Sequence, residues 1–155
     1  MWFLLVLLAI GFAPPAFATP APASTVAACI AAAEGEFAAQ RACIGQVNAA
    51  CQDAEDGGVT TAGMVTCANR ERDEWVDLRD AALSTLRTRE SAAQSASRDR
   101  ALSAHAAWSQ ARCAYDASLY EGGSMAIYAA AACEMGQTAD IALTLHMRAH
   151  DLLPD

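Results

Sequence analysis

The stretch LYEGGSMAIY, residues 119–128, decides how the C-terminal half of this chain folds. On both sides of it the sequence is rich in alanine and in other residues that favour helices. Gly122 and Gly123 interrupt this pattern, because glycine adopts the positive φ angles at which a chain turns sharply. Cys113 and Cys133 flank the interruption. The stretch therefore predicts a loop between two helices that a disulfide closes.

Helical periodicity also extends upstream of this loop. It is clearest over residues 62–88, where one face is apolar except for Glu71 and the opposite face carries Asp73, Asp77 and Asp80, as a solvated surface does. Further helices are expected at residues 25–33 and 37–53, in a segment that ends near residue 120, and at residues 138–152. Residues 88–97 fit either a turn or the continuation of one long helix. We expect an all-α, disulfide-stapled hairpin or bundle, in which two long antiparallel helices carry shorter packed helices.

The composition excludes one large class of function. The chain of 155 residues has no lysine, and its ten arginines stand against eighteen carboxylates, which gives a net charge of −8. A nucleic-acid-binding protein would show a basic patch, so that class is excluded. An acidic surface keeps a protein soluble, and it also suits a basic partner.

The N-terminal residues predict export. The apolar run Trp2–Phe12 is too short to cross a bilayer but suits the core of a signal peptide, and residues 16–18 read Ala-Phe-Ala, a cleavage pattern. We expect a signal peptide at 1–18, a flexible leader at 19–24 and a single domain at 25–155. The mature protein would then be periplasmic or secreted, with no transmembrane segment. As a minor alternative, Val26–Cys29 resembles a lipobox, which would make a lipoprotein anchored through Cys29.

Six cysteines indicate an oxidising compartment, and their spacing alone leaves fifteen possible connectivities. Each successive pair brackets a predicted break between helices, and helices joined by a short loop return side by side. The predicted bonds are Cys29–Cys43, Cys51–Cys67 and Cys113–Cys133. Each closes a loop worth about 3 kcal/mol in the chain-entropy estimate.

Several other residues have the chemistry of a possible site. A buried Glu71 needs a partner, and we expect a structural ion pair with Arg112 on the next long helix. His146 and His150 lie four residues apart without the Glu of a zinc peptidase motif, so they are interpreted as surface histidines. Ser124 is not in a G-x-S-x-G elbow. We therefore expect a protein that is not an enzyme and that has no metal site and no cofactor.

Two segments carry a resemblance to a known family. The string CAYDASLYEGGSMAIYAAAACEMGQT, residues 113–138, has a cysteine, an aromatic residue two positions later, Gly-Gly-Ser, a second cysteine and then a threonine. The string GMVTCANRERDEW, residues 63–75, precedes it. Both resemble the lysozyme inhibitor LprI-like family of small secreted bacterial proteins. The resemblance implies an all-helical, disulfide-bonded, exported domain and an ability to inhibit lysozyme.

The chain departs from the family pattern at three positions. Trp108 and Arg112 keep their spacing of four, but Cys113 follows at once, so His105 and Ser109 occupy the positions where the family has Trp and Arg. Ile141 stands where the family has an arginine three residues after the threonine. A shift of three residues is less than one helical turn, so Trp108 and Arg112 are expected to remain on the core-facing side.

Two functions from different classes remain open. The first is a non-enzymatic inhibitor that binds a basic lysozyme, or muramidase, through a rigid loop. The residues of this expected binding loop are Glu121, Gly122, Gly123 and Ser124. The second is a structural or interaction module of the cell envelope, with another partner and without lysozyme inhibition. A glycine turn that only connects two helices would suit this second function.

Overall fold

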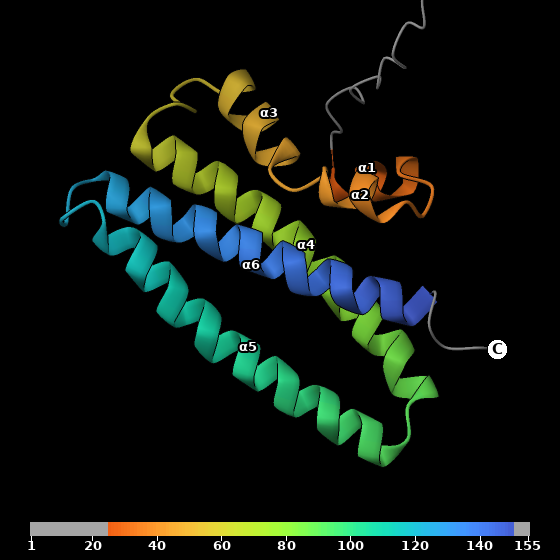
Figure 1. Ribbon diagram of the computed structural model, residues 1–155. Coiled ribbons are helices and arrows are strands. Elements are labelled where there is room, and N and C mark those ends of the chain that lie inside the picture. The colour runs from red at the N-terminus through yellow and green to blue at the C-terminus, as the bar shows by residue number, and fades with distance from the viewer. Residues whose placement is uncertain (1–24, 151–155) are drawn as a thin grey trace, which may run out of the picture.

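The computed structural model describes residues 25–150, and within this range the chain is helical without a strand (Figure 1). The helices are α1 (Val26–Ala32), α2 (Phe37–Arg41), α3 (Gln46–Ala54), α4 (Thr61–Arg89), α5 (Ala92–Ser118) and α6 (Met125–His150). The predicted all-α, disulfide-stapled architecture is confirmed. The predicted signal peptide and leader lie outside the described residues. Within the described residues, every helix is too short or too polar to cross a membrane.

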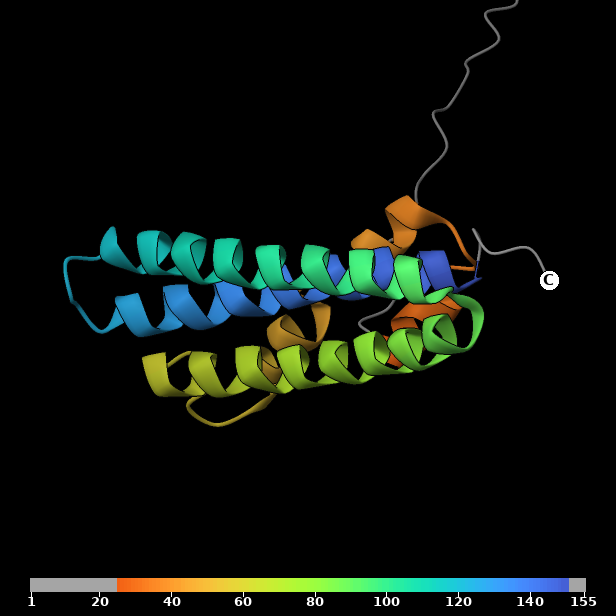
Figure 2. The ribbon, with the colours of Figure 1, turned by 90° about the horizontal axis from the view of Figure 1, so that it is seen from below.

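Three long helices form the frame of the molecule. Successive long helices reverse direction, so α4 and α6 run the same way and α5 runs opposite to both (Figures 1 and 2). The structure adds a long helix to the two that were expected, because α6 begins at Met125, directly after the Gly-Gly-Ser loop, and not near Thr138. Helix α6 packs against both α4 and α5, whereas α4 and α5 make little contact with each other.

The main core lies between α4, α6 and the short N-terminal helices. Trp75 of α4 and Leu143 of α6 are its largest fully buried apolar side chains. Ala68, Ala139 and Ala142 are also fully buried, and such small side chains let neighbouring helix backbones approach closely. A second, smaller cluster lies near the C-terminal ends of α4 and α6.

Two of the predicted helix boundaries are now defined. Residues 88–97 contain a turn, since Ser91 starts α5 with a capping box in which its hydroxyl and the Gln94 side chain each bond the other's backbone N–H. The expected helix 37–53 is divided into α2, which ends at Arg41, and α3, whose N-cap Gly45 has a φ of 90°.

The disulfides join the pairs that the helix breaks favoured: Cys29–Cys43, Cys51–Cys67 and Cys113–Cys133. The pairing prediction is therefore confirmed, and no described cysteine is free. A lipid thioether on Cys29 is incompatible with the Cys29–Cys43 bond, so the lipoprotein alternative is overturned. A small fold with this many disulfides is consistent with an extracytoplasmic location.

Glu71 is buried, as its place on the apolar face of α4 predicted, but its partner is different. Its carboxylate accepts hydrogen bonds from the backbone N–H groups of Gly45 at 2.6 Å and Asn48 at 2.7 Å, and from the indole Nε1 of Trp75 at 2.9 Å. Gly45 is the N-cap of α3 and has no side chain with which to cap it. Glu71 thus satisfies free N–H groups at the start of α3 and complements the helix dipole.

The predicted Glu71–Arg112 ion pair is wrong. Arg112 lies on α5, which packs against α6, and its Nε lies 3.5 Å from Asp116 Oδ2 on the same helix. The Arg112 side chain is half exposed. Burying a carboxylate costs free energy unless hydrogen bonds or an opposite charge offset that cost. Here three neutral N–H donors offset it without a cation.

Replacing Glu71 tests this anchor. Glu71→Ala leaves buried N–H groups of Gly45, Asn48 and Trp75 without an acceptor, so the free energy of unfolding should fall by about 3 kcal/mol or more. Asp77→Ala removes an exposed carboxylate from the same helix and should change it by less than about 0.5 kcal/mol, as should Arg112→Ala. Urea melts measure all three. A loss below about 1 kcal/mol for Glu71→Ala would contradict the role given to Glu71.

The disulfide assignment has a direct chemical test. Thiol titration of the purified mature protein under denaturing, non-reducing conditions should detect no free thiol, because all six cysteines are bonded. Mass spectrometry of a non-reduced digest should recover the three predicted pairs. Two titratable thiols, or a peptide that links Cys29 to any residue other than Cys43, would show that the pairing is wrong.

Candidate functional site: the tip of the α5–α6 hairpin

The connection between α5 and α6 is a tight turn with defined backbone hydrogen bonds. The N–H of Glu121 donates to the carbonyl of Ser118 at 3.1 Å, and the N–H of Gly123 donates to that of Tyr120 at 2.8 Å. Glu121 and Gly122 have φ angles of 49° and 76°. The positive φ expected of the glycine pair thus falls on Gly122 and on the residue before it, while Gly123 is not among the positive-φ residues. The turn is ordered by its own backbone.

A disulfide fixes the two helices that carry this turn. Cys113 and Cys133 join α5 to α6 over a sequence separation of 20 residues. Cys113 is 3% exposed, and it is the only residue of α5 that is buried. The expected binding-loop residues, Glu121 to Ser124, are all exposed. The tip therefore presents a polar loop whose two ends are held by a disulfide between the buried Cys113 and the partly buried Cys133.

Large apolar side chains also lie exposed around the tip. Trp108, Tyr115 and Leu119 are 52%, 64% and 62% exposed, and their spacing of seven and four residues places them along one side of α5, which we call the outer stripe. Successive residues turn by about 100°, so the outer stripe lies nearly opposite Cys113 and points away from α6. In the turn Tyr120 is 47% exposed, and at the start of α6 Ile127 is 64% exposed. Tyrosine and tryptophan are enriched at binding hot spots.

The outer stripe corrects the expectation that Trp108 and Arg112 face the core. The Arg112 guanidinium lies over the Trp108 ring at 5.7 Å, and both side chains are largely exposed. The spacing of Trp108, Tyr115 and Leu119 is visible in the sequence, but apolar spacing alone was interpreted as core. Because α5 touches only one other long helix closely, most of its apolar residues remain exposed. An arginine stacked on tryptophan is itself common at interfaces.

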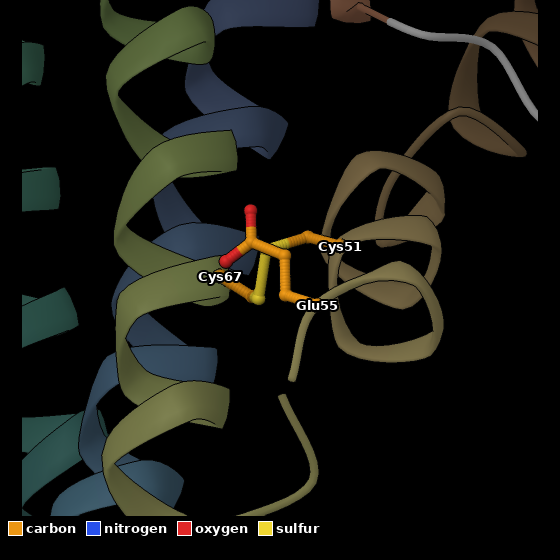
Figure 3. Close-up of side chains that lie close together, drawn as sticks. All are labelled: Cys51, Glu55 and Cys67. Carbon is orange, nitrogen blue, oxygen red and sulfur yellow. A yellow bond between two sulfur atoms is a disulfide. The ribbon is translucent and has the colours of Figure 1, made fainter. Parts of the chain in front are cut away.

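One cluster of potential metal ligands occurs among residues 25–150, and its chemistry excludes a metal. Cys51, Glu55 and Cys67 lie close together, but Figure 3 shows that the two sulfur atoms form a disulfide, so no thiolate is available. The Glu55 carboxylate is paired with Arg70 at 2.6 Å. This cluster is therefore a structural staple between α3 and α4.

The two C-terminal histidines lie close together at the end of α6. The ring centroids of His146 and His150 are 4.6 Å apart, and both rings line a cavity of about 440 Å³ beside α1 and α2. His150 is exposed and His146 is half-buried. No Cys, Asp or Glu within the described residues completes a three-ligand set with them.

Two glycines in the C-terminal half of the chain provide a matched test of the turn. Gly122→Ala should lower the free energy of unfolding by about 1 kcal/mol, because alanine at a φ of 76° is strained although the space is open. Gly136→Ala, in the interior of α6 where the space is also open, should raise it by up to about 1 kcal/mol. Thermal or urea melts measure whether the free energy of unfolding falls or rises in each variant. Equal changes in the two variants would mean that the turn does not require a left-handed residue at position 122.

Comparison with known proteins identifies the family. No curated protein and no solved structure matches the chain. The family model for the lysozyme inhibitor LprI matches residues 51–145, which is more than half of the chain. The matched region runs from α3 to α6 and contains the Cys51–Cys67 and Cys113–Cys133 bonds and the hairpin tip, while α1 and α2 precede it. The chain belongs to the lysozyme inhibitor LprI family.

Proposed function

We propose that this protein is an exported, non-enzymatic inhibitor that binds a basic lysozyme through the tip of the α5–α6 hairpin. Residues 1–18 act as its signal peptide, and residues 25–155 form its single domain, which works in the periplasm or outside the cell. The family match supports lysozyme inhibition as the activity. We choose the tip as the binding site because it combines a turn held by a disulfide with exposed aromatic residues.

The tip has the physical properties of an inhibitory loop. Its backbone is ordered before binding, so little conformational entropy is lost when a partner closes around it. Tyr120 and the outer stripe supply apolar area, and aromatic anchors contribute most of the free energy at protein interfaces. A turn between two helices is convex, and the substrate cleft of an enzyme is concave, so the shapes suit each other.

Charge supports a basic partner. The chain carries a net charge of −8, and Asp116 and Glu121 place carboxylates beside the exposed tyrosines of the tip. Opposite net charges on two proteins accelerate their encounter, and added salt weakens that effect. Lysozymes that carry a strongly positive surface are therefore the enzymes of this class that the protein should inhibit first.

A lytic assay tests the proposal. The purified mature protein, at micromolar concentration and low ionic strength, should slow lysis of bacterial cell walls by at least one class of lysozyme. Inhibition should weaken as salt rises past about 0.1 M, where the screening length falls to about 10 Å. If lysozymes of several classes remain fully active, the inhibitor proposal fails and an interaction module of the cell envelope takes its place.

Variants of the tip test the site. Glu121→Ala/Ser124→Ala should raise the inhibition constant, and Tyr115→Ala/Tyr120→Ala should raise it by tenfold or more, since one lost hot-spot side chain costs about 1.4 kcal/mol or more. Asp77→Ala/Ser84→Ala is the matched control, because it removes one carboxylate and one hydroxyl from exposed positions of α4. Circular dichroism should show unchanged helicity in all of them. An unchanged inhibition constant in both tip variants would place the contact elsewhere.

A further inference from the structure

A groove runs along α6 between α4 and α5. It consists of two adjoining cavities of about 470 and 780 Å³, which share Ile141 of α6 as part of their lining. In Figure 2, α4 and α5 lie on opposite sides of α6, and these two helices make little contact with each other. The lining of α6 extends from Ala130 to Arg148, so the groove is about 27 Å long at 1.5 Å per residue. Its shape suits an elongated ligand.

The larger cavity has an apolar floor. Leu86 of α4, Leu102 of α5 and Leu145 of α6 meet Ile141 there, and Leu102 and Ile141 remain partly exposed to the cavity. Glu90 and Arg98 close one wall as an ion pair whose side chains are 11% and 10% exposed, so they neutralise each other. Six of the twelve residues that line this cavity are apolar and six are polar or charged, so polar side chains border the apolar floor. An acyl chain fits its chemistry.

The smaller cavity is polar and cationic. Arg72 and Arg79 of α4 line one side, and His105 and Ser109 of α5 line the other. Glu134 is the single carboxylate in this lining, and Arg72 Nη1 lies 3.5 Å from its Oε2. Of the ten arginines in the chain, four line the groove, against two carboxylates. The lining residues of the groove therefore carry a formal excess of two positive charges (four arginines less two carboxylates) on a protein whose net charge is −8.

The arginines of the smaller cavity remain available to a ligand. Arg72 and Arg79 are paired with Asp73 and Asp80, the next residues in the chain, whose side chains are 69% and 58% exposed. Exposed pairs of this kind contribute about 0–1 kcal/mol, so a phosphate or carboxylate can replace them with little loss. Guanidinium groups bind such anions with two parallel hydrogen bonds.

We infer that this groove binds a single-chain amphiphile with an anionic head group. The acyl chain lies over Leu86, Leu102 and Leu145 in the larger cavity, and the phosphate or carboxylate head lies between Arg72 and Arg79 in the smaller one. The site is separate from the hairpin tip, since the outer stripe is on the opposite side of α5 from the groove-lining Cys113. The inference does not depend on lysozyme inhibition.

The charge of the head group tests the inference. The negative net charge of the protein favours a cationic amphiphile, whereas the groove should favour an anionic one. Titration calorimetry on the mature protein should compare dodecyl phosphate, dodecyl maltoside and dodecyltrimethylammonium, each below its critical micelle concentration. The anionic amphiphile should bind at least tenfold more tightly than the neutral one, and the cationic one should bind most weakly. Inorganic phosphate alone should give no measurable heat, since the acyl chain supplies most of the buried area. Tightest binding of the cationic amphiphile, or equal binding of all three, would overturn the inference.

Variants then place the ligand within the groove. Arg72→Gln/Arg79→Gln should abolish the preference for dodecyl phosphate over dodecyl maltoside, while Arg87→Gln, on α4 outside the groove, should preserve it. Ala101→Trp fills the larger cavity from an exposed position on α5 and should weaken both ligands tenfold or more. Ala104→Trp, exposed on α5 but outside the lining, should not. Loss of the preference in Arg148→Gln but not in Arg72→Gln/Arg79→Gln would overturn the placement of the head group.

The same variants separate this inference from the proposed function. Ala101→Trp should leave lysozyme inhibition unchanged, and Tyr115→Ala/Tyr120→Ala should leave amphiphile binding unchanged. If the protein binds dodecyl phosphate but inhibits no lysozyme, the inference about the groove stands and the proposed function is overturned. If the protein inhibits lysozyme but shows no preference among the head groups, the inference about the groove is overturned and the proposed function stands.

Discussion

The buried carboxylate of Glu71 is the contact on which the N-terminal half of the structure depends. It lies on α4 and accepts hydrogen bonds from two backbone N–H groups at the start of α3, while the indole of Trp75 donates a third. Three residues further along α4, Glu74 accepts a hydrogen bond from the N–H of Val26 at 2.6 Å, at the start of α1. Helices as short as these are not stable alone in water. Carboxylates of α4 and two disulfides hold them in place.

The C-terminal half depends on a different constraint, which is the one-sided packing of α5. Only Cys113 of this helix is buried, so its attachment relies on its contact with α6 and on the Cys113–Cys133 bond. The same one-sided packing produces both candidate binding surfaces. The outer stripe stays exposed because no helix covers the far side of α5, and the groove stays open because α4 does not close against the near side.

The departures from the family pattern fall together in space. His105, Ser109 and Ile141, which occupy positions where the family pattern has Trp, Arg and Arg, all line the smaller cavity of the groove. The smaller cavity is thus lined in part by residues at which the resemblance implied other side chains, whereas the hairpin tip carries the Cys–Gly-Gly-Ser–Cys arrangement on which the resemblance rests.

The sequence by itself determined the elements that local chemistry controls. Alanine-rich periodic segments specified most of the helices, the glycine pair specified the turn at 122, and cysteines on either side of each predicted break specified the disulfides, because all of these depend on near neighbours in the chain. The turn at Gly45, inside the expected helix 37–53, was not predicted. The sequence also indicated that Glu71 would be buried. Only the tertiary structure decided what Glu71 contacts and which side of α5 is covered. The first depends on the placement of α3 against α4, and the second on the placement of α5 against α6 and away from α4. An apolar stripe looks the same in a sequence whether a partner helix covers it or leaves it exposed.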